Sequence, residues 1–178
     1  MLIETNDDNP VPYSVKIYNY PEIIQHIHHT LNRTGTLAFC EATNYCYLKI
    51  LDAYIFDAFS LLENKPLNMP IKMPDYFTAN NPIGAHISLV YPEENNASRV
   101  RDYIQSKPVV LNAISFKVNV LLSVNVFNKT QFVIVVTSPQ LDAIRKKFDL
   151  PEKLNYHGLL VPFHITIATS YPQQETQN

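Results

Sequence analysis

The hydrophobic and polar positions of this chain fall into short blocks that change repeatedly between two periods. Blocks with a period of two predict strands, and blocks with a period near 3.6 predict helices. Residues 13–18 alternate and predict a strand. Pro21 opens a helix that we predict to run through residue 33, with Gly35 ending it. The chain therefore reads as a mixture of short strands and helices.

A first segment, residues 36–92, contains four predicted elements in a definite order. Two alternating blocks within residues 36–51 predict a β-hairpin. Asp52 is placed to cap a helix over residues 53–63, where apolar residues recur at helical spacing. A proline-rich loop follows, and residues 85–91 predict the strand that ends the segment.

A second segment, residues 114–172, repeats this order. Residues 114–137 predict a hairpin around the turn at 127–129. Ser138 is placed to cap the following helix, and residues 163–169 predict the final strand after another loop. Because such repeats constrain the whole fold, we expect an α+β, two-lobed, pseudo-symmetric fold. Each lobe would be a small antiparallel sheet with outer helices, and a cleft would lie between the lobes.

The remaining segments fit a single domain over residues 1–178. A helix predicted at residues 97–106 links the two segments, and residues 1–35 form an N-terminal extension. The alternative is that the matching order of elements arose by chance, since many α+β domains alternate in this way.

Composition narrows the class of protein. The hydrophobic fraction of 46% supports a folded core, and a net charge of −2 with scattered basic residues argues against binding to long nucleic acid. The composition is compatible with a small anionic ligand held in one pocket. The two cysteines, Cys40 and Cys46, make neither a disulfide framework nor a zinc motif. The polar N-terminus and the lack of a long apolar run lead us to expect a cytoplasmic monomer, of its own cell or of a host, away from membranes.

The final strand of each segment carries the candidate chemistry. His86 is followed two residues later by Ser88, and His164 is followed two residues later by Thr166. Because successive side chains in a strand point to opposite faces, each histidine shares a face with its hydroxyl residue. The apolar residues between them point to the other face.

Such a pair suits phosphodiester chemistry without a metal. An imidazole acts as a base when neutral and as an acid when protonated, both near neutral pH. If the two strands faced each other, one histidine could activate a hydroxyl or water and the other could protonate the leaving oxygen. The hydroxyls of Ser88 and Thr166 could stabilise the charged phosphate oxygens. The sequence does not tell which of His86 and His164 is the base.

A short motif needs weighing against chance. A third match, His28-His29-Thr30, lies in a predicted helix, where residues two apart do not share a face. A single histidine on a strand is more often a structural residue, but the two others occupy the same place in both segments, each before Tyr-Pro. Those tyrosines, Tyr91 and Tyr171, are candidates for stacking on a base, with plain packing as the alternative.

Two further clusters favour ordinary roles. The histidines of the N-terminal helix, including His26 and His29, offer at most two ligands to one ion, so we expect no metal and no other cofactor. The basic run that begins at Arg145 lies on a predicted amphipathic helix, where a solvated face is the expected interpretation.

The paired motifs and the repeated order resemble the 2H phosphoesterase superfamily, over roughly residues 36–172. This resemblance implies catalytic roles for His86 and His164 and phosphate binding by Ser88 and Thr166. It implies small nucleotide or short RNA substrates with 2′,3′-cyclic or 2′-5′ phosphodiester bonds. Many relatives carry Thr where the first motif here has Ser88. The alternative is a non-catalytic nucleotide-binding or protein-interaction domain of the same fold.

Overall fold

Three antiparallel sheets and four helices make up the part of the chain that the structure describes. The structure is a computed structural model, and it describes residues 3–5, 11–81, 83–108 and 113–172. The mixture of small antiparallel sheets and helices agrees with the fold class expected from the sequence. None of the helices in these ranges is long and apolar enough to span a membrane.

The first sheet has four strands in the order β5-β4-β3-β6. Their bounds are His86–Val90 for β5, Cys46–Lys49 for β4, Thr34–Phe39 for β3 and Ala113–Ser115 for β6. Every neighbouring pair in this sheet is antiparallel. The hairpin β3–β4 and the strand β5 are the strands predicted for the first segment, although β3 begins at Thr34, two residues before that segment.

The second sheet also has four strands, in the order β11-β8-β7-β2. Their bounds are His164–Ser170 for β11, Lys129–Thr137 for β8, Lys117–Val126 for β7 and Tyr13–Tyr18 for β2. A third, small sheet joins the hairpin of β9 (Leu154–Tyr156) and β10 (Leu159–Val161) to β1 (Glu4–Thr5). The β9–β10 hairpin lies in a segment that the sequence pattern predicted as a loop. The described part of the N-terminal extension thus contributes β1 and β2 to two sheets and the first two residues of β3 to the other.

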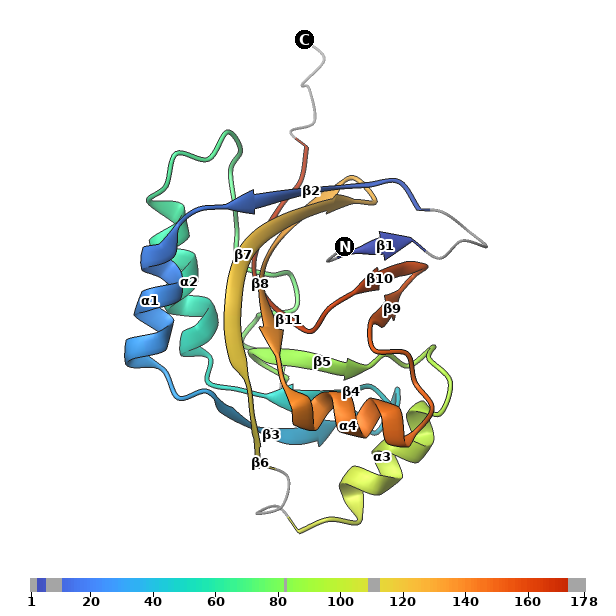
Figure 1. The fold of residues 1–178 in the computed structure, drawn as a ribbon. Coiled ribbons are helices and arrows are strands. Elements are labelled where there is room, and N and C mark those ends of the chain that lie inside the picture. Colours follow the sequence, from blue (N-terminus) through green and yellow to red (C-terminus); the bar gives the residue numbers. More distant parts are fainter. Residues whose placement is uncertain (1–2, 6–10, 82, 109–112, 173–178) are drawn as a thin grey trace.

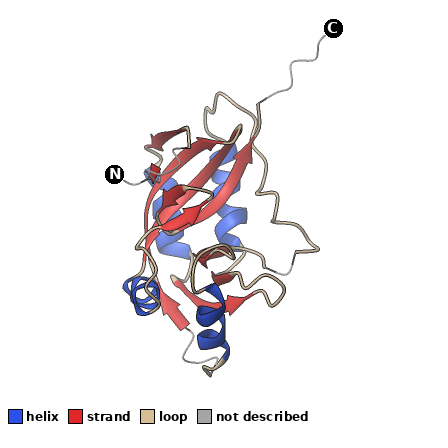
Figure 2. Ribbon diagram, turned by 90° about the vertical axis from the view of Figure 1, so that its right-hand side faces the viewer, coloured by secondary structure: helices blue, strands red, loops and turns tan. Residues whose placement is uncertain are grey.

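Helices cover each of the two four-stranded sheets (Figure 1 and Figure 2). Helices α1 (Pro21–Thr30) and α2 (Ala53–Glu63) pack against the second sheet, on β7 and β11. Helices α3 (Ala97–Gln105) and α4 (Pro139–Lys147) pack against the first sheet. Each of the two segments therefore supplies a helix that buries its apolar face on the sheet of the other segment.

Three local predictions have different outcomes. Gly35 does not end α1 but lies inside β3, where an added Cβ would stand 2.6 Å from the carbonyl oxygen of Lys49. Asp52 makes no capping bond, because its Oδ1 accepts a 2.8 Å hydrogen bond from the amide of Ala85. Ser138 caps α4 as predicted, its hydroxyl accepting from the third amide beyond it at 3.3 Å.

The long strand predicted from residue 114 to residue 126 is divided between two sheets. β6 pairs with β3 in the first sheet, whereas β7 pairs with β2 and β8 in the second. Phe116 lies at the break and donates its amide to the carbonyl of Arg33. Since both parts alternate, the sequence pattern contains no sign of the division.

Candidate active site

A pocket of about 200 Å³ brings the four motif residues together. His86 and Ser88 of β5 and His164 and Thr166 of β11 all line it. The floor is the inner face of the second sheet, whose aliphatic side chains come from β7 and β8. Since one water molecule takes about 10–15 Å³ on this measure, the pocket has room for a small organic ligand.

The two histidines are held in the same way. The Nδ1–H of His86 donates to the carbonyl of Gly84 at 2.8 Å, and that of His164 donates to the carbonyl of Pro162 at 2.8 Å. A carbonyl oxygen only accepts, so these bonds place the proton of each neutral ring on Nδ1. Each Nε2 therefore carries the lone pair that a general base requires.

Burial keeps both rings neutral in the free protein. Desolvation lowers the pKa of His86 to about 4, with the bond to Gly84 opposing this shift and the charge of a protonated His164 adding to it. Desolvation also lowers the pKa of His164, although this side chain is partly open to the pocket. The strands that carry the two rings, β5 and β11, contact each other, and both imidazoles line the same pocket.

The two hydroxyl residues differ in their partners. The Ser88 hydroxyl shares a 2.6 Å hydrogen bond with the hydroxyl of Tyr45. Thr166 pairs with Val133 of β8, and its carbonyl accepts from the hydroxyl of Tyr76 at 3.2 Å. The ladder of β11 is irregular beyond Thr166. Thr169 also lines the pocket, and its buried hydroxyl has no hydrogen-bond partner among the residues that the structure describes.

Aromatic rings surround His86. Its ring centroid lies 4.6 Å from that of Tyr76, 5.6 Å from that of Tyr47 and 5.8 Å from that of Tyr45. Tyr91 lines the pocket and also stacks on Tyr45 at 6.0 Å, so it both packs and faces the ligand space. Burial raises the pKa of Tyr45, Tyr76 and Tyr91, which keeps these phenols neutral. Tyr45 and Tyr76 were not predicted as site residues, because no spacing relates them to the motifs.

Tyr171, the second candidate for base stacking, is not among the residues that line the pocket. Its hydroxyl donates to Asp75, and the ammonium groups of Lys72 and Lys129 lie 4.7 and 5.4 Å from its ring centroid. Two lysine ammonium groups therefore lie against this ring, where they compete with a stacked base. Of this cluster, Asp75 and Lys129 do line the pocket.

This cluster at the pocket is held together by charge. Asp75 forms ion pairs with Lys72 at 2.8 Å and Lys129 at 2.9 Å. Partial burial by itself raises the pKa of Asp75, but hydrogen bonds from Lys72, Tyr171 and Lys129 outweigh it and hold the pKa below its usual range. Two lysines and one carboxylate leave one excess positive charge, which favours an anionic ligand.

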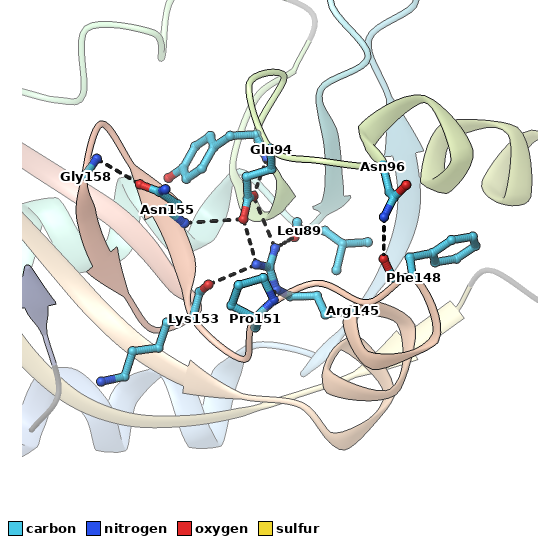
Figure 3. Close-up of polar contacts among 10 residues, drawn as sticks. Leu89, Glu94, Asn96, Arg145, Phe148, Pro151, Lys153, Asn155 and Gly158 are labelled. Atoms are coloured by element: carbon cyan, nitrogen blue, oxygen red, sulfur yellow. Dashed lines mark hydrogen bonds and ion pairs between the residues drawn. The ribbon is translucent and has the colours of Figure 1, made fainter. Parts of the chain in front are cut away.

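A buried ion pair fixes the end of β5 (Figure 3). Arg145 is fully buried and pairs with Glu94 at 2.7 Å, so it does not belong to the solvated face predicted for its basic run. The guanidinium also donates to three carbonyls, those of Leu89, Pro151 and Lys153. Arg145 is therefore the link between β5, which carries His86 and Ser88, and the segment that enters the β9–β10 hairpin.

The third His-x-Thr match lies elsewhere. His28 is on α1 and bonds to the guanidinium of Arg33 at 2.9 Å, outside the pocket lining. His26 pairs with Asp57 at 3.1 Å. In the ranges that the structure describes, no three histidine, cysteine, aspartate or glutamate side chains gather where they could hold a metal ion.

A known protein family matches most of this chain. No curated protein and no solved structure matches the chain. Residues 46–174 match the family described as Swiss Army Knife, 2H phosphoesterase domain. The match covers more than two thirds of the chain and includes both motif strands, which confirms the resemblance seen in the sequence. The chain therefore belongs to this family of 2H phosphoesterase domains, and its general chemistry is that of a phosphoesterase.

Proposed function

We propose that the protein hydrolyses 2′,3′-cyclic or 2′-5′ phosphodiester bonds of RNA or nucleotides, without a metal. The observation that carries this proposal is the shared pocket of His86 and His164, each with Nδ1 bound to a backbone carbonyl. Each ring thereby keeps Nε2 for the substrate. We also propose that the two four-stranded sheets act as two pseudo-symmetric lobes with this pocket as the cleft between them.

In the reaction, one neutral imidazole takes a proton from the attacking water or hydroxyl. The other, as imidazolium, gives a proton to the leaving oxygen, so the first ring ends protonated and the second neutral. Proton exchange with solvent then restores the starting state before the next turnover. A bound phosphate anion raises the pKa of both rings, which supplies the protonated partner that the free protein lacks. Ser88 and Thr166 donate hydrogen bonds to the charged non-bridging oxygens.

Turnover of nucleoside 2′,3′-cyclic phosphates and of 2′-5′-linked dinucleotides tests the proposal. We expect His86→Ala and His164→Ala each to lower kcat by about 10²–10⁴-fold. Ser88→Ala and Thr166→Ala remove one donor each and cost less, about 10–10³-fold. His28→Ala is the matched control, since this third match lies outside the pocket, and it leaves kcat unchanged.

Chelation separates this mechanism from a metal-dependent one. Activity measured after treatment with EDTA should equal that of untreated protein, because histidines and hydroxyls do the work assigned to metals in other nucleases. Loss of activity that added Mg²⁺ or Zn²⁺ restores would refute the metal-free mechanism.

The second candidate is a non-catalytic nucleotide-binding domain of the same fold. The low pKa of His86 favours it, because little imidazolium exists near neutral pH in the free protein. Under this candidate the same ligands bind, but no substrate of either class is turned over at any pH between 4 and 8.

A further inference from the structure

Two tight turns meet beside the pocket. Phe127-Asn128 joins β7 to β8, and His157-Gly158 joins β9 to β10. The ring centroids of Phe127 and His157 are 6.3 Å apart and nearly perpendicular, at 78°. Tyr156 completes the group, at 6.5 Å from Phe127 and 4.7 Å from His157. We call these three residues the tip cluster.

Phe127 occupies a backbone conformation that does not suit it. Its φ is 52°, and that of Asn128 is 56°, so both central residues of the turn are left-handed. Turns of this kind favour Asn, Asp and Gly, whereas a bulky side chain at positive φ is strained. Every other described non-glycine residue at positive φ is Asn, Asp or His.

Burial does not explain the choice of Phe127. Phe127 is 55% exposed as a residue, and the side chain of His157 is 62% exposed. An exposed aromatic ring in a strained turn contributes little to the core, and strain of this kind is concentrated at functional sites. The exposed face of Phe127 is therefore free to contact a ligand.

The tip cluster is continuous with the pocket. Val126 and Lys129, on either side of the turn, both line the pocket, and so does Tyr156. The Tyr156 ring lies 5.6 Å from that of Tyr91, which in turn stacks on Tyr45 beside Ser88. A row of aromatic rings thus runs from the phosphate-binding residues to the exposed tip.

We propose that Phe127, supported by Tyr156 and His157, is a stacking platform for a base of a single-stranded oligonucleotide. The proposal rests on the function proposed above, in which His86 and His164 hold the reacting phosphate. It names the substrate class of that site: an oligonucleotide that extends beyond the reacting nucleotide. Single-strand binding sites combine such aromatic platforms with basic groups that follow the backbone.

Distance and charge fit this substrate. Lys129 is four residues along β8 from Val133, the partner of Thr166, which corresponds to about 13 Å of strand. The platform lies beyond Lys129, so its base belongs to a neighbouring nucleotide. Lys129 lines the pocket between the motif residues and the tip cluster and supplies a positive charge for the intervening phosphate. Glu93, 3.9 Å from His157, disfavours an anion at that end of the tip cluster.

Two substrates that end in the same group measure how much the platform contributes to kcat/KM. One is a nucleoside 2′,3′-cyclic phosphate, and the other is a trinucleotide that ends in the same cyclic phosphate. We expect wild-type protein to prefer the trinucleotide in kcat/KM. Phe127→Ala should reduce the ratio of the two kcat/KM values by about tenfold or more, and Phe127→Trp should retain it. Phe56→Ala is the matched control, since Phe56 is an aromatic residue of similar exposure on α2, and it leaves the ratio unchanged.

A second variant excludes misfolding as the cause. Phe127→Asn places a residue at this position that left-handed turns prefer. It should raise Tm by about 2–4 °C while lowering the same ratio, because the strain and the platform disappear together. If Phe127→Ala and Phe127→Asn both kept the wild-type ratio, the platform would be refuted.

A binding measurement separates this inference from the proposed function. The probe is a labelled 2′-deoxy trinucleotide with a 3′-phosphate, which has no 2′-hydroxyl to react. Fluorescence anisotropy should show that the Kd of this probe is at least about tenfold higher for Phe127→Ala than for wild type. Binding that depends on Phe127 without any turnover of cyclic phosphates would reject the catalytic function and keep the platform. Equal binding to both proteins would reject the platform whatever the turnover.

Discussion

Arg145→Met is the perturbation whose cost the structure defines most fully. Methionine fills much of the space of the arginine stem but has neither the charge nor the N–H donors. The change removes five hydrogen bonds: two to the carboxylate of Glu94 and one each to the carbonyls of Leu89, Pro151 and Lys153. The carboxylate, only 4% exposed, is then left without its countercharge.

The expected cost is large. Removing one partner of a buried ion pair costs about 3–5 kcal/mol, because the other charge stays buried and uncompensated. Each carbonyl that loses its donor adds up to about 1–3 kcal/mol, although local rearrangement and water entry offset part of this sum. We therefore expect Arg145→Met to lower the free energy of unfolding by about 4 kcal/mol or more. Total stabilities of domains are only about 5–15 kcal/mol.

Urea unfolding followed by circular dichroism measures this loss. With a slope of about 2 kcal/mol per molar urea, 4 kcal/mol moves the midpoint by about 2 M. Lys146→Met is the matched control, because the adjacent side chain is exposed, and it changes the free energy of unfolding by less than about 0.5 kcal/mol.

A double variant identifies the buried charge as the cause. Adding Glu94→Gln to Arg145→Met removes the uncompensated carboxylate, while the amide still offers an acceptor for the amide of Tyr91. We expect the double variant to regain about 1–2 kcal/mol relative to Arg145→Met alone. The reasoning would be refuted if Arg145→Met lost less than about 1 kcal/mol, or if Glu94→Gln deepened the loss.

Four further predictions follow from the site and its supports. Folding lowers the pKa of His86 to about 4, so between pH 6.5 and 4 the unfolded chain binds more protons than the folded protein. The free energy of unfolding should therefore be highest above pH 6.5 and fall by up to about 3 kcal/mol as the pH drops to 4, which unfolding measured over this pH range checks. Because the pKa of His164 is lowered too, kcat/KM should follow a bell in pH with its maximum below 6.5, and a maximum above pH 7 would contradict these environments. Asp52→Ala should cost about 1–3 kcal/mol in urea unfolding by removing the acceptor of the Ala85 amide, and Asp52→Asn should cost less. Gly35→Ala should cost about 1–3 kcal/mol, since its Cβ would stand 2.6 Å from a carbonyl of β4; an unchanged Tm would show that β3 and β4 can separate freely.

The elements that the sequence predicted well are those whose pattern is local. Alternation defined β2, and helical spacing defined α2, both with the observed bounds. The same alternation placed each motif histidine on one face with its hydroxyl residue, and all four line one pocket. A side-chain period depends only on neighbouring residues, so it can be read without knowing what the element contacts.

Only the tertiary structure decided how these elements combine. The exchange of α2 and α4 between the two sheets, the division of the strand at Phe116 and the burial of Arg145 all depend on partners distant in sequence. The same is true of Tyr45 and Tyr76, which reach the site from a hairpin end and a loop. A periodic pattern specifies which face of an element is buried but not which surface covers it, because that depends on which distant segments pair when the chain closes its loops.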